Sequence, residues 1–256
     1  MFDYRVFAQV LWRDSVALFL RWGFWLLLAV WVFLTAFMYF AYLDDFIAIQ
    51  PQLRAKNSPY GVTDIVIIPY IKTLGLLGIL ILTALVSRAF YEELWAPFGA
   101  YFRALHLPVT GIVAAKSVQL FWIVAIIVWV IALPILVSGL FFTYDMRRVL
   151  LVLLALSGLL WVIGLLTIWL SQLLSHSVLV VLVAVSCLTM TELAVRLVTS
   201  PEWLLPILAF FSPIAHFNQM ANGVMMRSSI VFLMVFTLLM WVLIHRCFSN
   251  RYLFVR

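Results

Sequence analysis

Charged residues are scarce in this chain: they make up 10% of the 256 residues, while 67% of the residues are hydrophobic. A soluble domain of this length could not bury so much apolar surface in one core. The composition therefore predicts an integral membrane protein. The net charge of +6 does not indicate a nucleic-acid partner, because the basic residues lie at the ends of apolar runs, where Lys and Arg meet lipid headgroups.

Cysteine is nearly absent, and the common nucleotide-binding sequence is missing. Cys187 and Cys247 are too few and too far apart for a disulfide framework or a metal cluster. A phosphate-binding loop of the G-x-x-x-x-G-K-[ST] kind does not occur, so we expect no ATP binding by this chain alone. Long internal repeats and low-complexity linkers are lacking too, which favours a single membrane domain over residues 1–256.

Long apolar runs, in contrast, are abundant. A helix crosses the ~30 Å hydrocarbon core of a bilayer with about 20 apolar residues, so each run of that length predicts a span. The expected fold is all-α, with six transmembrane helices and with both termini on the same side. The predicted spans are about 22–41, 65–87, 117–142, 149–170, 178–195 and 230–244.

The basic residues around the spans predict the orientation. With cytoplasmic termini, the inner side carries slightly more Lys and Arg than the outer side, as the positive-inside rule requires. Ahead of the first span, Arg5 and Arg13 fall on one helical face, and Val10 and Ala17 lie off it. This pattern predicts an interfacial helix over about residues 1–20, with a plain lead-in to the first span as the alternative.

The segment between the second and third spans combines charge, proline and histidine. Residues 89–109 read AFYEELWAPFGAYFRALHLPV, in which the prolines predict a short helix that ends before the third span. Its aromatic side chains would form an exposed apolar surface unless a partner covered them. The segment therefore favours a docking role, and the candidate docking residues are Glu92, Glu93, Trp95, Phe98, Tyr101, Phe102 and Arg103.

An intramembrane metalloprotease is a less favoured interpretation of the two glutamates. Proteases of this kind that process prenylated proteins have an arginine where this chain has Pro97, and a histidine four positions after a phenylalanine. Here Phe211 and His216 are one residue too far apart. Metal ligation needs several converging donors, which the sequence does not supply, so we expect no catalytic residue and no metal site.

Three further polar features have weaker interpretations. Glu192 and Arg196 are four apart, which makes them a candidate intramembrane polar pair or a pair that merely ends the span at the interface. Asp64 and Lys72 are a second candidate polar pair, for which an interfacial role at the start of the second span is favoured over an intramembrane one. Methionines near His216 would suit copper, but packing is the favoured role of such side chains.

Several motifs resemble one membrane-protein family. The runs SRAFYEE (87–93) and LHLPVTGIVAAK (105–116) resemble the segment between the second and third spans of ABC-2-type transporter permeases. In that family an R-x-F-x-E-E stretch leads through Gly-Thr-x-Glu to Leu-Pro-Val-Ser/Thr and a lysine. The acidic residue of Gly-Thr-x-Glu is replaced here by Phe102, which favours a dedicated partner ATPase.

Two later runs extend this resemblance. FFSPIAHFNQMANGVMMRSSIVFL (210–233) resembles the sequence ahead of the last span in the short permeases related to gliding-motility and nitrous-oxide-reductase-maturation transporters. LLSHSVLVVLVAVSCL (173–188) resembles the Ser-rich turn into their fifth span. The resemblance touches most of the chain after residue 87.

The resemblance implies a permease subunit of an ATP-binding cassette exporter in the bacterial inner membrane. Two permease chains, identical or related, would each dock on a nucleotide-binding subunit through a cytoplasmic coupling helix between spans 2 and 3. ATP and Mg would bind to that ATPase dimer, and this chain would hold no cofactor. A periplasmic accessory protein is a further candidate partner, and the alternative function is a mechanotransmitting subunit that acts on such a partner without transport.

Overall fold

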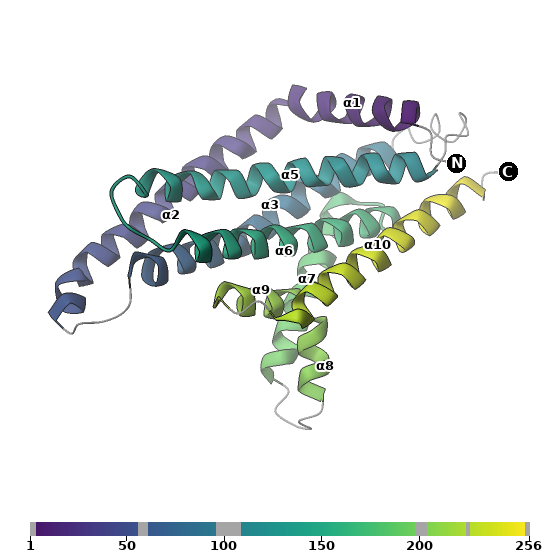
Figure 1. Ribbon diagram of the computed structural model, residues 1–256. Helices are drawn as coiled ribbons and strands as arrows, with labels where there is room; N and C mark the ends of the chain where they lie inside the picture. The colour runs from purple at the N-terminus through teal and green to yellow at the C-terminus, as the bar shows by residue number, and fades with distance from the viewer. Residues whose placement is uncertain (1–3, 56–60, 96–108, 198–203, 224–225, 254–256) are drawn as a thin grey trace.

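The computed structural model describes residues 4–55, 61–95, 109–197, 204–223 and 226–253, which are all-helical and contain no strand. Six of these helices are long and apolar enough to cross a membrane, which confirms the predicted fold class (Figure 1). They are α2 (Trp22–Ala55), α3 (Ile68–Trp95), α5 (Val109–Ser138), α6 (Met146–Leu173), α7 (Ser177–Leu197) and α10 (Arg227–Leu253).

Shorter elements flank these spans. The predicted N-terminal helix is present as α1 (Tyr4–Leu20), and a break at Arg21 separates it from α2. A π-helical turn, η1 (Thr63–Ile67), leads into α3. Between α7 and α10 lie two short helices, α8 (Leu204–Phe211) and α9 (Pro213–Ala221).

The boundaries of the spans differ from prediction mainly where a helix runs on through polar residues. The first span continues to Ala55 instead of ending near residue 41, and the last continues to Leu253 instead of 244. The third begins at Val109, ahead of the predicted 117, and ends at Ser138 instead of 142. Hydropathy marks the part of a helix that suits lipid, whereas helical hydrogen bonding can continue into the polar residues beyond it.

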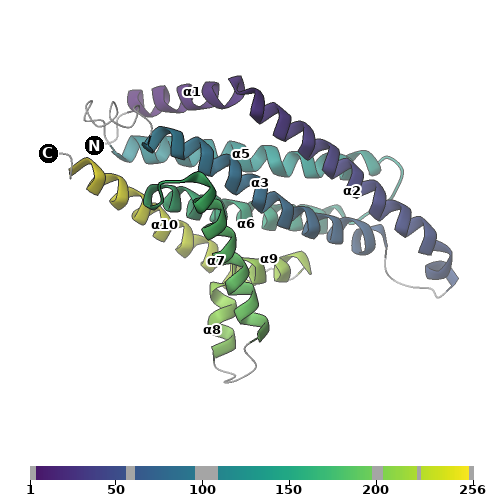
Figure 2. The same ribbon diagram turned by 180° about the vertical axis from the view of Figure 1, so that it is seen from behind.

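The centre of the bundle is formed by α3, α5 and α6. About half of the residues of these three spans are buried, whereas fewer than a quarter are buried in α2, α7 and α10. α1 packs on α5, α7 packs on α3 and α6, and α10 packs on α6. Figures 1 and 2 show α7 and α8 projecting from one side of the bundle.

Two core aromatics donate hydrogen bonds to backbone groups of a neighbouring span. The Trp31 indole of α2 donates to the carbonyl of Ile127 at 3.4 Å, and the Tyr70 hydroxyl of α3 donates to that of Ile131 at 3.2 Å. Both side chains are almost fully buried. Because an unpaired polar atom inside a membrane bundle is costly, these bonds help to hold α2 and α3 against α5.

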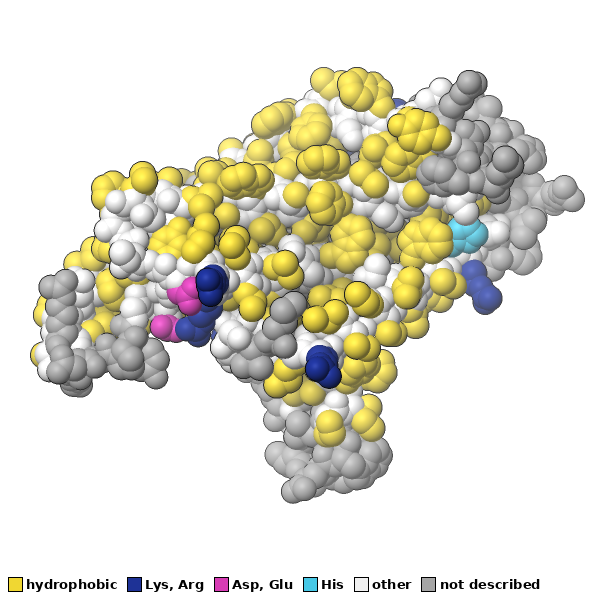
Figure 3. Space-filling view, in the orientation of Figure 1, with side chains coloured by type: hydrophobic (Ala, Val, Ile, Leu, Met, Phe, Trp, Pro, Cys, Tyr) yellow, Lys and Arg dark blue, Asp and Glu magenta, His cyan; other side chains and the backbone are white. Residues whose placement is uncertain are grey.

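Both described ends of the chain, in α1 and α10, lie at the same end of the bundle (Figure 1). The end of α3 and the start of α5 lie there too, and we call this the termini end. We call the opposite end, where α6 begins, the loop end. Between the two, the face in Figure 3 is mostly apolar, with charged side chains in small groups, as expected for a surface that faces lipid.

Candidate functional site

The predicted docking segment lies at the termini end, between the end of α3 and the start of α5. α3 continues through Glu92 and Glu93 to Trp95, although the side chains of these three residues lie outside the described part of the structure. The remaining candidate docking residues also lie outside the described residues: Phe98, Tyr101, Phe102 and Arg103. Their docking role therefore stays a prediction, and the described helices on either side supply the geometry.

A buried ion pair lies two turns into α5. Lys116 Nζ is 2.5 Å from the Asp14 Oδ2 of α1, and the two side chains are only 5% and 1% exposed. Arg13 donates to the other carboxylate oxygen of Asp14 through Nε at 2.9 Å and Nη2 at 2.5 Å. The Asp14 carboxylate therefore lies between two cations, which offsets the cost of its burial.

The sequence places Asp14 at this junction because it lies four residues after Val10 on one face of α1. Val10 and Asp14 are both buried, and α1 packs on α5. Ala17, which was expected on the face away from the basic residues, is exposed. The face that α1 buries therefore includes a carboxylate, which ties the N-terminal helix to the span that follows the docking segment.

A recess lies where α1, α2 and α3 meet. It has a volume of about 530 Å³ and is formed by the α1–α2 break and the last turns of the described part of α3. Arg21 and Arg88 line it together with apolar side chains such as Phe24. The termini end therefore presents two guanidinium groups next to the point at which α3 enters the docking segment.

The loop end contains a second polar cluster, whose pairing differs from prediction. Asp64 of η1 pairs with the Arg148 Nη1 of α6 at 2.5 Å, while Lys72 donates to the Asn222 side chain at 2.9 Å. The considered pair of Asp64 with Lys72 is therefore wrong. Eight residues of helix separate the two positions by about 12 Å along the axis, too far for direct contact.

The start of α6 is capped by the same cluster. The Asp145 carboxylate accepts hydrogen bonds from the backbone N–H groups of Arg147 and Arg148, which would otherwise lack helical partners. The Asp145 N–H in turn donates to the Thr63 hydroxyl at 3.1 Å. These bonds join α6 to the turn that begins the second span.

Glu192 belongs to the junction of α7 with the α8–α9 turn. It accepts a long hydrogen bond of 3.4 Å from the Ser212 hydroxyl, and Ser212 also caps the start of α9. The side chain of Arg196 lies outside the described residues, so the predicted pairing of Glu192 with Arg196 stays a prediction.

His216 of α9 is fixed by both ring nitrogens. Nε2 lies 2.9 Å from the Phe210 carbonyl, which can only accept, so this nitrogen carries the proton. Nδ1 lies 3.1 Å from the Ser229 hydroxyl and therefore accepts from it in the neutral ring. The imidazole also stacks on Phe232, with ring centroids 4.5 Å apart. This arrangement selects one neutral tautomer at the start of α10.

The copper interpretation gains nothing from this geometry. Both nitrogens of His216 already face protein partners, and Met220 is a buried packing residue. Within the described ranges, no group of three or more His, Cys, Asp or Glu residues is placed to hold a metal ion. Any ligand role for His216 would require breaking one of its hydrogen bonds.

We expect the stability of the fold to fall as the pH falls below about 6.5, because of His216. Burial lowers the pKa of this imidazole from its ordinary value of 6.5. Above that value the ring is neutral in both states. Below it, the unfolded chain binds a proton that the folded chain resists, so up to about 1.4 kcal/mol of stability is lost per pH unit. Thermal unfolding in a non-ionic detergent should report this loss, which levels off below the pKa of the folded state.

His216→Gln is the matched variant, because an amide can donate and accept at similar positions but does not titrate. The difference between its pH dependence and that of the wild type isolates the contribution of His216. Identical slopes for the wild type and His216→Gln would contradict this account.

Comparison with protein-family models finds no matching family, and comparison with curated proteins finds no match. The length and hydropathy of the helices indicate a multi-pass membrane protein with six spans.

Proposed function

We propose that this chain is the permease subunit of an ATP-binding cassette transporter of the ABC-2 type, which couples ATP hydrolysis on a separate subunit to export. The support lies in the six spans and in the placement of the docking segment, whose flanking helices meet the termini end of the bundle. In this proposal that end is cytoplasmic, the membrane is the bacterial inner membrane, and the docking segment is the coupling helix.

The observation that carries the proposal is the buried pair of Asp14 with Lys116. Lys116 lies only two turns after the start of α5, the first described helix beyond the docking segment. A load on that segment would reach α5 directly. Because the pair is buried and its carboxylate is bound on both oxygens, α1 would follow α5 as one unit. The junction therefore suits a subunit that converts movement of a docked partner into movement of its spans.

The mechanism that follows is a change between two arrangements of the bundle. ATP and Mg bind to the partner ATPase dimer, whose closure moves the docked segments of two permease chains. Each state of the bundle must contact the ATPase differently, since a partner shifts an equilibrium only by its differential affinity for the two states. Glu92 and Glu93 would position the segment against the neighbouring spans.

The second permease chain is an expected partner because the outer spans are poorly covered. Large apolar side chains on α7 are exposed, among them Val178, Leu182 and Met190. Lipid covers part of such a surface in any membrane protein, and a second copy or a related chain would cover the rest.

The proposal is tested by purifying the tagged chain from its native membranes in mild detergent. We expect an ATP-binding cassette subunit to co-purify and to hydrolyse ATP in the complex. The chain alone should not hydrolyse ATP. Purification that repeatedly yields the chain without an ATPase would contradict the proposal.

The aromatic residues of the docking segment should carry the binding. Alanine in place of a buried interface aromatic typically costs ~2 kcal/mol or more, whereas loss of a charge at the rim costs much less. At least one of the variants Trp95→Ala, Phe98→Ala, Tyr101→Ala and Phe102→Ala should therefore release the ATPase. Arg103→Ala is the control that should weaken binding only mildly. If all four aromatic variants retain wild-type stoichiometry, the segment is not the docking site.

A further inference from the structure

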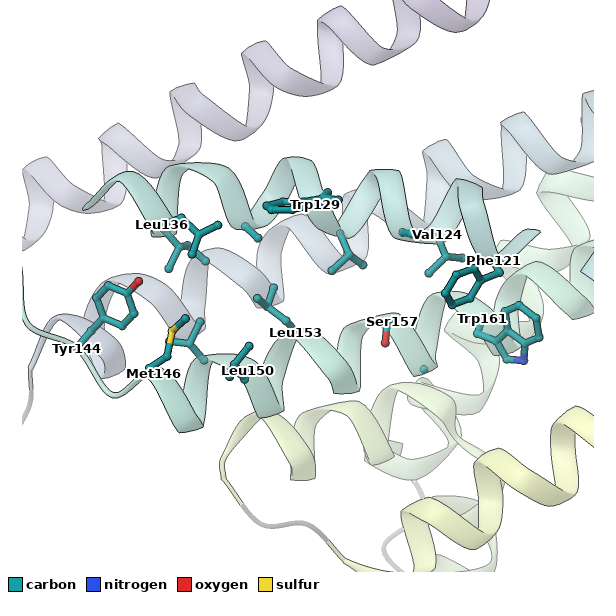
Figure 4. Close-up of a pocket in the computed structure, with 16 residues that line it drawn as sticks. Phe121, Val124, Trp129, Leu136, Tyr144, Met146, Leu150, Leu153, Ser157 and Trp161 are labelled. Atoms are coloured by element: carbon teal, nitrogen blue, oxygen red, sulfur yellow. The ribbon is translucent and has the colours of Figure 1, made fainter. Parts of the chain in front are cut away.

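A groove runs along the surface between α5 and α6. Figure 4 shows Tyr144 and Met146 at one end, Phe121 and Trp161 at the other, and Trp129, Leu153 and Ser157 along the walls. The lining side chains recur at three- and four-residue spacing on both helices, so each helix contributes one continuous stripe. Nearly all of them are apolar. The Ser157 hydroxyl donates to the carbonyl of Leu154 in its own helix and so adds no free donor.

The dimensions of the groove suit one hydrocarbon chain. From Met146 to Trp161 the α6 wall extends about 22 Å at 1.5 Å per residue. That length exceeds the ~15 Å that one leaflet contributes to the hydrocarbon core. The groove has a volume of about 600 Å³.

An exposed arginine lies at the loop end of the groove. Arg147 follows the lining residue Met146 and is exposed, and its side chain has no ion pair or hydrogen bond with any described residue. Its neighbours are largely matched in charge: Arg148 pairs with Asp64, and Asp145 caps the helix. Arg147 is therefore a guanidinium available at the level where a lipid chain in the groove would carry its headgroup.

Tyr144 shapes this end. Its hydroxyl lies so close to Gly139 that a Cβ there would be only 2.8 Å away, so the ring rests directly on the glycine. Aromatic residues with a polar tip are common at the level of lipid headgroups. The groove is therefore apolar along its length and has a polar group, the Tyr144 hydroxyl, at the end near Arg147. A phospholipid has the same distribution, with an apolar chain and a polar headgroup.

We infer that the α5–α6 groove is a binding site for an anionic phospholipid, with one acyl chain lying along the groove and the headgroup phosphate at Arg147. The lipid belongs to the leaflet at the loop end. It is retained more strongly than bulk lipid because the groove buries its chain on two sides and the guanidinium matches its charge. The inference rests on the groove and its mouth, and it holds whether or not the chain partners an ATPase.

Native mass spectrometry of the purified full chain tests this site, with dioleoyl-phosphatidylglycerol and dioleoyl-phosphatidylcholine as probes. We expect one retained phosphatidylglycerol per chain and a preference for it over phosphatidylcholine. Arg147→Gln should lower that preference about fivefold, the usual contribution of one basic residue near an anionic surface. Arg227→Gln, which removes another exposed arginine at a helix start, is the control that should leave the preference unchanged.

The acyl-chain contact is tested separately by filling the groove. Ser157→Phe places a large ring in the groove, towards its Phe121–Trp161 end, and should abolish retention of both lipids. Ser186→Phe adds the same ring to an exposed position on α7 and should leave retention unchanged. Retention of lipid in Ser157→Phe, or an unaltered preference in Arg147→Gln, overturns the site. Conversion of a dimer to a monomer by Ser157→Phe, with lipid retained, would assign the groove to a second copy instead.

Discussion

Lys116→Met is expected to destabilise the folded protein by at least about 3 kcal/mol, because removing one partner of a buried ion pair leaves the other charge buried and less well compensated. The Asp14 side chain is 1% exposed and has lost its contact with Lys116 in this variant. Arg13 remains on its other oxygen, so we expect the lower end of the usual range of about 3–5 kcal/mol. Unfolding by dodecyl sulfate in mixed micelles measures the change.

A double variant separates the charge effect from packing. Asp14→Leu combined with Lys116→Met replaces the pair by apolar groups of similar size, which is often neutral in a buried site. We expect the double variant to regain most of the lost stability. If it is as unstable as Lys116→Met alone, the loss comes from packing between α1 and α5. A Lys116→Met variant as stable as the wild type would mean that the pair is not buried in the folded protein.

The six spans could be predicted from the sequence because their signal is local. Each span is a long run of apolar residues, and a helix is the simplest way to satisfy its backbone inside lipid. The turn between α6 and α7 also appears where the Ser-rich run predicts it, around Ser175. Such features need no knowledge of distant residues.

The start of α5 could not be predicted in the same way. Hydropathy penalises Lys116 as a free charge, so the third span was expected to begin after it. In the structure the lysine is buried because it pairs with Asp14. That partner lies 102 residues earlier in the chain, so hydropathy cannot take it into account. The signal that could have identified the pair is weak: a carboxylate four residues from Val10 on the apolar face of a helix that also carries arginines.

The other polar contacts were missed for the same reason. Asp64 meets Arg148 across 84 residues, and the Lys72–Asn222 bond spans 150. Helical spacing predicts only partners three or four residues apart. His216 was considered for its neighbouring methionines, whereas its hydrogen-bond partners are the Phe210 carbonyl and Ser229 at the start of the next span. Contacts between elements depend on packing that a single sequence does not specify.

Gly164→Val is expected to lower the stability by roughly 3 kcal/mol, because a side chain at this position of α6 would collide with Leu120 of α5. A Cβ at Gly164 would lie 2.3 Å from the Leu120 Cδ1 of α5, and Leu120 is fully buried, so its side chain has little room to move. Valine adds two further methyl groups to that clash. The better helix propensity of a non-glycine residue offsets at most about 1 kcal/mol of the cost. Gly23→Val is the control, since nothing lies within 4 Å of a Cβ at that position.

Leu120→Ala provides the decisive comparison for this close approach. Alone, it should cost about 2–5 kcal/mol by leaving a cavity. Combined with Gly164→Val, it removes as many carbon atoms as valine adds, in the same place. The double variant should therefore be more stable than the sum of the two single losses by at least about 1 kcal/mol, as expected for residues in direct contact. Strict additivity of the two losses would show that the helices do not meet through this pair, and unfolding in mixed micelles distinguishes the two outcomes.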